Sequence, residues 1–175
     1  MLKRKIKDTI RDVADFPKPG ILFKDITPLF HNQQLCNEIV SAFAKDLDER
    51  KINAIIGVES RGFLFGFALA NKLNIPFILV RKAGKLPFKT ISYEYELEYG
   101  SAKVEMQVNE IQPGWNVIIH DDLLATGGTA EAAAKLVNMQ GGNVAGFAFV
   151  VELDFLKGRE RLTQYSEHIN SLINY

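Results

Sequence analysis

Apolar positions along the chain follow two periodicities. Leu2, Ile6, Ile10 and Val13 recur at near-helical spacing, which predicts a short amphipathic helix over residues 2–13. Similar patterns predict further helices over residues 33–50, 62–73 and 129–139. Short apolar runs typical of buried parallel strands occur at residues 52–58, 75–80, from 117 onward, and 144–153. This alternation predicts an α/β fold, with a mostly parallel central sheet and helices on both faces.

Residues 83–100 break this rhythm. They include Gly84, Pro87 and Gly100, are rich in Lys, Tyr and Glu, and have little core pattern. A segment of this length without regular structure predicts a mobile lid or binding loop. The alternating residues 102–108 predict a returning strand, and residues 157–175 predict one helical turn and an edge strand.

Composition predicts one globular domain over the 175 residues, because 47% of them are hydrophobic and 24% charged. Lys+Arg and Asp+Glu number 21 each, which argues against nucleic acid or an anionic membrane as the main partner. The single cysteine, Cys36, favours a reducing compartment. The basic N-terminus lacks the apolar segment of a secretory signal, and no apolar stretch is long enough to span a bilayer. We therefore expect a cytoplasmic protein.

The most informative motif covers residues 117–129, where an apolar run leads into two acids and then a glycine loop. The acids are Asp121 and Asp122, and the loop comprises Ala125, Thr126, Gly127, Gly128 and Thr129. Main-chain N–H groups of such a loop, at a helix start, can surround a phosphate. The acids could hold ribose hydroxyls or a hydrated magnesium ion. An ordinary strand-turn-helix junction would explain the glycines, but the adjacent carboxylates favour a binding site because they repel one another without a partner.

This motif resembles the 5-phosphoribosyl-1-pyrophosphate (PRPP) site of the type I phosphoribosyltransferase family. The resemblance covers nearly the whole chain and implies that family's fold, with residues 1–32 as a small N-terminal hood over the base. Residues 33–175 would then form the core and residues 83–103 a flexible catalytic loop. Asp121 and Asp122 would hold the ribose, and residues 125–129 its 5-phosphate. The resemblance also implies a Mg²⁺ ion held mainly by PRPP, pyrophosphate and water, with Asp121 and Asp122 as candidate ligands.

A second motif, residues 57–62, ends one apolar strand and begins a helix. Its Gly-x-x-x-x-Gly skeleton is that of a nucleotide triphosphate loop, but Phe63 and Leu64 replace the required Lys and Ser/Thr. In the family it resembles, this loop binds pyrophosphate through main-chain N–H groups, often with a cis peptide between non-proline residues. The resemblance implies a pyrophosphate site that comprises Glu59, Ser60, Arg61, Gly62, Arg81, Lys82 and Lys85. In family dimers, the residue matching Arg81 commonly reaches the partner's site, so a homodimer is implied.

A third motif, the Phe-Pro-x-Pro-Gly-x-x-Phe-x-Asp pattern of residues 16–25, resembles the hood of the adenine-using members. Composition alone would describe it as a rigid proline loop with a packing aromatic residue. The resemblance implies that the backbone of Leu22 and Lys24 meets the adenine edge and that Phe23 shapes the pocket. Leu123 and Leu153 are the further adenine contacts that it implies.

Residues 82–100 resemble the catalytic loop of the same family. Glu98 matches the acid placed near the purine imidazole, and Tyr99 is its neighbour in the lid. With Arg61 and Lys85, Glu98 forms the implied catalytic set. The implied reaction transfers the phosphoribosyl group of PRPP to N9 of adenine, giving AMP and pyrophosphate, which is a pentosyltransferase step of purine salvage.

Two alternatives stay open at this point: a phosphoribosyltransferase for hypoxanthine or xanthine, and a non-catalytic regulator that senses PRPP. A dinucleotide-binding domain is disfavoured because no Gly-x-Gly-x-x-Gly follows a strand. His120 departs from the family pattern, and we interpret it as a hydrogen-bonded strand residue rather than a catalytic one. His31 and His168 are too far apart in sequence to suggest zinc.

Overall fold

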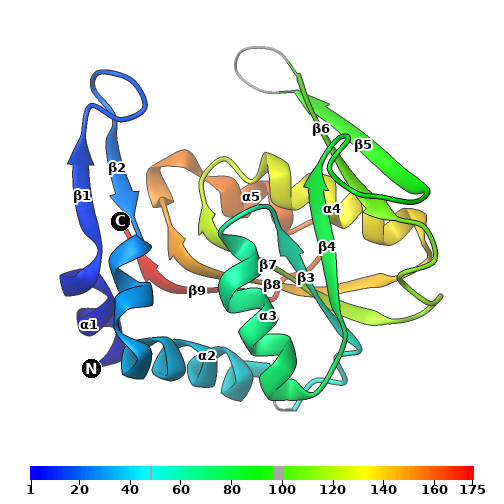
Figure 1. The fold of residues 1–175 in the computed structure, drawn as a ribbon, viewed down its shortest axis with the longest axis horizontal. Coiled ribbons are helices and arrows are strands. Elements are labelled where there is room, and N and C mark those ends of the chain that lie inside the picture. Colours follow the sequence, from blue (N-terminus) through cyan, green and yellow to red (C-terminus); the bar gives the residue numbers. More distant parts are fainter. Residues whose placement is uncertain (48, 97–100) are drawn as a thin grey trace.

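The computed structural model describes residues 1–47, 49–96 and 101–175. Its centre is a seven-stranded sheet in the order β5-β6-β4-β3-β7-β8-β9 (Figure 1). The strands are β3 (Ala54–Val58), β4 (Phe77–Lys82), β5 (Thr90–Glu96), β6 (Ser101–Gln107), β7 (Asn116–Leu124), β8 (Asn143–Glu152) and β9 (Ile169–Asn174). The five strands β3, β4, β7, β8 and β9 pair in parallel, whereas β5 and β6 form an antiparallel hairpin that joins β4 at the edge. The predicted fold class is confirmed.

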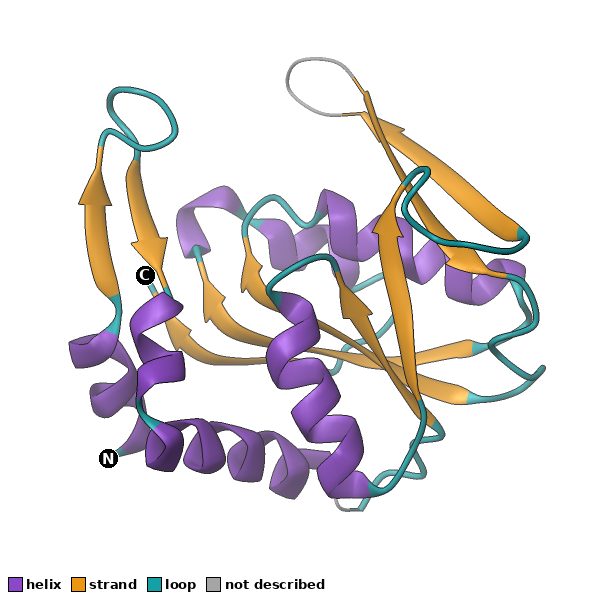
Figure 2. Ribbon diagram, in the orientation of Figure 1, coloured by secondary structure: helices purple, strands orange, loops and turns teal. Residues whose placement is uncertain are grey.

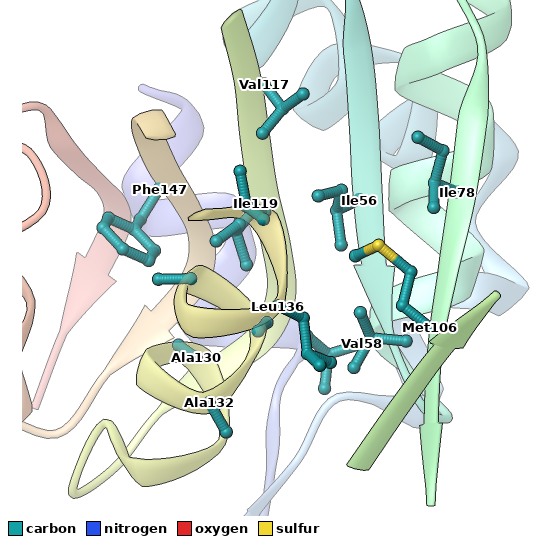
Figure 3. Close-up of a cluster of buried hydrophobic side chains, with 14 of the residues drawn as sticks. Ile56, Val58, Ile78, Met106, Val117, Ile119, Ala130, Ala132, Leu136 and Phe147 are labelled. Atoms are coloured by element: carbon teal, nitrogen blue, oxygen red, sulfur yellow. The ribbon is translucent and has the colours of Figure 1, made fainter. Parts of the chain in front are cut away.

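Helices cover both faces of the sheet (Figure 2). They are α1 (Leu2–Thr9), α2 (Gln33–Leu47), α3 (Gly62–Leu73), α4 (Gly128–Met139) and α5 (Gly158–Leu162), with 3-10 turns at Thr27–His31 and Asp154–Leu156. Successive strand residues point to opposite faces, so Ile55 packs with α1, α2 and α3, while Ile56 packs with α4. Figure 3 shows the α4 side, where Ile56 and Ile119 of neighbouring strands lie near Leu136 of α4. No helix among the described residues is long and apolar enough to cross a membrane.

The N-terminal segment differs from the prediction of one helix over residues 2–13. Helix α1 ends at Thr9, and β1 (Arg11–Ala14) pairs antiparallel with β2 (Leu22–Asp25). Ile6 and Ile10 remain buried, so the helical spacing was real for the first part of the pattern. Residues 11–14 form a strand instead of helix because they pair with β2, which begins at Leu22. Arg11 lies opposite Asp25 in this pairing.

Residues 83–100 also contain more regular structure than the sequence indicated. Strand β5 pairs with β6 along its whole length, from Thr90↔Gln107 to Glu96↔Ser101. Ile91, Tyr93 and Tyr95 alternate onto the α4 side of the sheet and pack against its core. Tyrosines and intervening charged residues concealed this period of two. Strand β6 lies within one residue of the predicted strand over 102–108. The mobility expected of residues 83–103 stays a prediction, as do the boundaries of the hood and core.

Candidate active site

Two of the predicted motifs meet at the carboxyl ends of β3 and β7. These strands are neighbours in parallel register, with Gly57 opposite His120, so the loops that follow them come together. They enclose a cleft of about 290 Å³ that is lined by Glu59, Ser60, Arg61, Asp121, Asp122 and Leu123. A slightly larger hollow of about 350 Å³ lies between α1 and α2, but its cation Lys5 is paired with Glu38 at 2.7 Å. The smaller cleft holds the chemically informative groups.

The acid pair lies in this cleft in a constrained arrangement. Asp122 is 5% exposed, and its Oδ2 lies 2.7 Å from Arg61 Nε. Asp121 accepts a hydrogen bond from the backbone N–H of Asp122 at 2.8 Å. Burial and the adjacent Asp122 carboxylate raise the pKa of Asp121 well above its usual range, against the opposing effects of that N–H and of Arg61. The site therefore favours a cation or a hydrogen-bond donor near these oxygens.

Gly62 explains how the predicted pyrophosphate loop, residues 59–62, approaches this acid pair. A Cβ atom at Gly62 would lie 2.9 Å from Asp121 Oδ1 and 3.0 Å from the carbonyl oxygen of His120. Any larger residue at position 62 would clash with β7, so glycine is what allows the start of α3 to lie this close to that strand. The peptide bond between Glu59 and Ser60 is cis, as the resemblance implied.

Arg61 joins all three predicted segments. Besides its ion pair with Asp122, its guanidinium carbon lies 5.3 Å from the ring centroid of Phe23 in the hood hairpin, which comprises β1 and β2. Its side chain is 38% exposed, so it is still accessible from the cleft. One cation thus lies between the predicted base-binding segment and the predicted ribose-binding acids.

The glycine loop after β7 lines a narrow hollow of about 70 Å³ together with the start of α4. Gly127 has φ of 81°, a conformation that side-chain-bearing residues rarely adopt. Its missing Cβ would lie 2.7 Å from the carbonyl oxygen of Gly158. A Cβ at Gly158 would in turn lie within 2.2 Å of the carbonyl oxygen of Ala125. The main chains of the loop and of α5 are therefore in direct contact.

An ion pair between Arg159 of α5 and Glu152 of β8 holds α5 beside the glycine loop, and the sequence motifs did not predict it. Arg159 donates to both carboxylate oxygens of Glu152, from Nε at 2.9 Å and from Nη2 at 2.5 Å, and its Nη1 donates to the carbonyl oxygen of Ile169 at 2.8 Å. Glu152 is 4% exposed. This bidentate pair holds α5 against β8 and β9, and so keeps Gly158 against the loop. In the sequence, this support is visible only as Gly158 and Arg159 at a helix start. Their partners lie in distant elements, so the sequence alone does not reveal the contacts.

On the other side of the cleft, Glu59 holds the end of β4. It accepts hydrogen bonds from Arg81 Nη2 at 2.9 Å and from the backbone N–H of Lys82 at 2.8 Å. The hydrogen bond from Arg81 is the main cause that lowers the pKa of Glu59, and burial opposes it. Arg81 Nη1 also donates to the carbonyl oxygen of Lys85 at 3.0 Å. These hydrogen bonds bring Glu59, Arg81 and the backbone of Lys82 together, while the reach of Arg81 into a partner subunit stays a prediction.

The hood hairpin lies beside the cleft, because the Phe23 ring is next to Arg61, and it could cover a base bound there. Phe23 packs edge-on against Phe16 at 5.1 Å between centroids, and Leu22 is 53% exposed. Lys24 pairs with Asp12 at 2.6 Å. Leu123 lines the cleft, and Leu153 donates its N–H to the carbonyl oxygen of Leu124 at the ends of β8 and β7. Their contacts with adenine stay predictions. Glu98 and Tyr99 lie outside the described residues.

His120 corrects one expectation. It is a buried strand residue, but neither ring nitrogen has a hydrogen-bond partner among the described residues. Burial lowers its pKa to about 4, and a contact with the backbone of Ala148 only partly opposes this. Its ring lies 5.4 Å from that of Phe43 in α2, so the apolar helix layer surrounds it. The sequence could not reveal which side chains would cover this strand position.

The acids fit a magnesium ion that is held mainly by its substrate. Within the described part of the chain, no three His, Cys, Asp or Glu side chains form a metal-binding group. Magnesium commonly binds through one or two carboxylates together with substrate phosphates and water. Asp121 and Asp122 provide such carboxylates, and Asp122 Oδ2 has the Arg61 ion pair at 2.7 Å but no hydrogen bond from the described residues.

The fold and this site together have the arrangement expected of a protein that binds a phosphorylated sugar at the ends of parallel strands. The family model described as "phosphoribosyl transferase domain" matches residues 26–171. The chain is 51% identical over 175 residues to adenine phosphoribosyltransferase of Cytophaga hutchinsonii, covering 100% of this chain and 97% of that relative. It is 54% identical over 170 residues to the enzyme of that name from Ureaplasma parvum, with 97% and 96% covered.

Solved structures agree with these sequence relatives. Adenine phosphoribosyltransferase from Thermoanaerobacter pseudethanolicus superposes with a TM-score of 0.95 at 49% identity, and each chain is covered completely. The Saccharomyces cerevisiae enzyme, solved with an imino-altritol bisphosphate and adenine, gives a TM-score of 0.91 at 44% identity, with 98% of each chain covered. The chain therefore belongs to the adenine phosphoribosyltransferase family.

Proposed function

We propose that this protein transfers the 5-phosphoribosyl group of PRPP to N9 of adenine, forming AMP and pyrophosphate in purine salvage. The observation that carries the proposal is the position of Arg61 between Phe23 and Asp122, in the cleft that Asp121 also lines. The yeast relative's complex with adenine and a bisphosphate supports the same pair of ligand types.

The chemistry requires positioning and charge neutralisation more than covalent help. The bond from the anomeric carbon to pyrophosphate breaks through an oxocarbenium-like state, and negative charge accumulates on the leaving group. Arg61, Lys85 and the main-chain N–H groups of residues 59–62 stabilise that charge. The N–H groups of residues 125–129 hold the distant 5-phosphate, so its binding energy orients the reacting carbon.

The acid pair has a separate task on the ribose. Asp121 and Asp122 accept hydrogen bonds from its hydroxyl groups, and they would hold a magnesium ion directly or through its water. When bound, the ion supplies positive charge that offsets the charge of pyrophosphate. The raised pKa of Asp121 is consistent with an acid that ionises fully only beside such a ligand.

The hood selects the base. Main-chain groups of Leu22 and Lys24 face the exocyclic amine and N1 of adenine, Phe23 covers the ring, and Leu123 and Leu153 complete the pocket. A 6-oxopurine would leave two buried polar groups mismatched, at a cost of roughly 1–3 kcal/mol each. Glu98 moves the imidazole proton near N7, and Tyr99 covers the site; both assignments rest on the sequence motif.

The protein acts as a homodimer in which Arg81 contributes to the partner's site. Exposed Leu64 and Phe67 of α3, at 52% and 61%, support an apolar face that a second copy would cover. Light scattering coupled to size-exclusion chromatography tests this state, and a monomer would contradict it. The cytoplasmic location expected from Cys36 stays a prediction.

The direct test is chromatographic measurement of AMP formed from adenine, PRPP and Mg²⁺ by the purified protein. Parallel reactions with hypoxanthine and xanthine test whether the protein uses another purine. Faster turnover of either base than of adenine would support that alternative. Calorimetry with Mg²⁺ and PRPP tests the regulator alternative, for which PRPP would bind without any product. Substitution of both Asp121 and Asp122 by Ala should abolish turnover and weaken PRPP binding.

A further inference from the structure

Tyr95 of β5 reaches the glycine loop from a distant part of the chain. Its hydroxyl oxygen lies 2.9 Å from Thr129 Oγ1, at hydrogen-bond distance. Its ring lies against the main chain at Gly128, where an added Cβ would be 3.3 Å from Cδ2 and 3.4 Å from Cε2 of the ring. Neither the sequence motifs nor the proposed reaction gives Tyr95 a role.

The Thr129 hydroxyl has one proton to donate and two lone pairs to accept. A phosphate dianion offers acceptors only, so a Thr129 hydroxyl that binds the phosphate alongside the N–H groups of the loop must direct its proton toward the phosphate. That orientation leaves the Thr129 oxygen free to accept from Tyr95. Of the two directions possible for the hydrogen bond, only donation from Tyr95 is compatible with phosphate binding by Thr129.

We propose that Tyr95 is a positioning residue for the 5-phosphate: it donates to Thr129 Oγ1, orients the Thr129 proton toward the phosphate, and braces Gly128 with its ring. The proposal rests on the proposed function, in which residues 125–129 bind that phosphate. Tyr95 itself does not contact the phosphate.

The surroundings of Tyr95 make it a firm support. Ile91 and Tyr93, on the same face of β5, pack against the buried cluster that includes α4. Tyr95 pairs with Ala102 of β6 in the hairpin ladder, so its backbone is held on one side as well. Because Gly128 begins α4, the ring lies beside the N–H groups that a helix start leaves free for an anion.

The test replaces Tyr95 with Phe, which keeps the ring against Gly128 and removes only the hydroxyl. We expect the KM for PRPP to rise about three- to tenfold, as for loss of one hydrogen bond, while the KM for adenine stays unchanged. Tyr93→Phe is the matched control, because it makes the same chemical change two positions earlier on the same face. Its KM values should equal those of the unmodified protein.

A double-mutant cycle with Thr129→Val identifies the route of the effect. If Tyr95 acts through Thr129, then Tyr95→Phe should add no further rise in KM for PRPP to that of Thr129→Val. Thermal unfolding of each variant shows whether it is folded. If Tyr95→Phe alone does not fold, Thr129→Ser with Tyr95 intact provides the second measurement: the retained hydroxyl should keep KM for PRPP within about twofold.

Several results would overturn the assignment. These are equal KM values for Tyr95→Phe and Tyr93→Phe, an equal rise in the KM values for adenine and PRPP, and additive effects with Thr129→Val. A tenfold or greater rise in KM for PRPP in Thr129→Ser would also overturn it. Failure of the unmodified protein to form AMP would instead overturn the proposed function, and this assignment with it, so the two failures are distinguishable.

Discussion

The two ligand-binding regions of the molecule are built in different ways. The glycine loop, residues 125–129, is held by main-chain contact with α5, and Gly127 and Gly128 are buried. The hood hairpin is largely exposed and is held by side chains. Its ion pairs Arg11–Asp25 and Lys24–Asp12 are each 2.6 Å long, and each joins an exposed side chain to a largely covered one.

We therefore expect the glycine loop to be rigid and the hood hairpin to be more adjustable. Backbone contacts in a packed interior tolerate little change, and overpacking costs typically about 1–3 kcal/mol. Exposed ion pairs contribute only about 0–1 kcal/mol each. Substitutions near the glycine loop should therefore disable PRPP binding abruptly, whereas those in the hood should change adenine binding gradually.

The largest effect is expected for Gly158→Ala. The new Cβ would lie 2.2 Å from the carbonyl oxygen of Ala125, so the glycine loop must move. A displacement of about 1 Å can reduce catalysis about 100-fold, and we expect that loss in kcat/KM for PRPP. Gly142→Ala is the matched control, because its Cβ would meet a side-chain methyl group, Cγ2 of Ile111, at 2.7 Å instead of a main-chain atom.

Steady-state kinetics and thermal unfolding of both variants check this prediction. Gly142→Ala should lose stability but keep its kinetic constants for PRPP, since its contacts are remote from the cleft. Equal kinetic losses in the two variants would mean that general destabilisation, rather than the position of the loop, is responsible.

Arg61→Ala ranks next, because Arg61 joins the two regions. Removal of a group that stabilises transition-state charge commonly costs about 100- to 1,000-fold in kcat, and we expect a loss in that range. Arg61→Lys should recover part of it, since the charge remains but the planar group beside Phe23 is lost. Arg4→Ala, at a residue whose side chain is 88% exposed, should have no effect on kcat. Turnover within threefold of the unmodified rate in Arg61→Ala would contradict the role.

Tyr175→Ala tests the hood itself with a smaller expected effect. Lys24 Nζ lies 4.0 Å from the centre of the Tyr175 ring, and Lys7 Nζ lies 4.9 Å from it. Loss of this support should raise the KM for adenine about three- to tenfold, the size of one or two cation–π contacts, with the KM for PRPP unchanged. Tyr175→Phe keeps the ring and should behave as the unmodified protein. Parallel changes in both KM values would show that the ring does not act on the hood alone.

Contiguous motifs were enough to predict the sheet, the helices on its faces and the three segments around Arg61. The apolar runs that precede residues 59 and 121 are buried parallel strands, whereas the equally apolar run that follows Gly62 is helix α3. Contacts between distant elements were not predictable in this way. The β1 strand depends on its partner β2, β5 is concealed by tyrosines and charges, and the Glu152–Arg159 pair forms only when α5 packs on the sheet. The environment of His120 depends likewise on Phe43 of α2.

The smallest predicted effect concerns Asp25 at the base of the hood. Hydrogen bonds from Thr27 and Arg11 lower its pKa to about 2. A carboxylate whose folded pKa lies below its unfolded value, near 4, stabilises the folded state above that unfolded value. This stabilisation is lost as the pH falls from about 4 through about 2. Because the Arg11 side chain is 62% exposed, solvent screens the attraction, and we expect a contribution of about 1 kcal/mol.

Denaturant unfolding of Asp25→Asn and of the unmodified protein between pH 7 and pH 2 measures this contribution. The difference in unfolding free energy should be constant from pH 7 to about pH 5 and should shrink toward zero near pH 2. Asp12→Asn is the matched control within the same hairpin, since it breaks the Lys24 ion pair but leaves the hydrogen bond from Thr27 to Asp25 intact. A difference for Asp25→Asn that does not change across this range would mean that its charge does not secure the hood. The hairpin would then depend on Phe16, Phe23 and the ring of Tyr175, and acid would leave adenine binding to the folded protein intact.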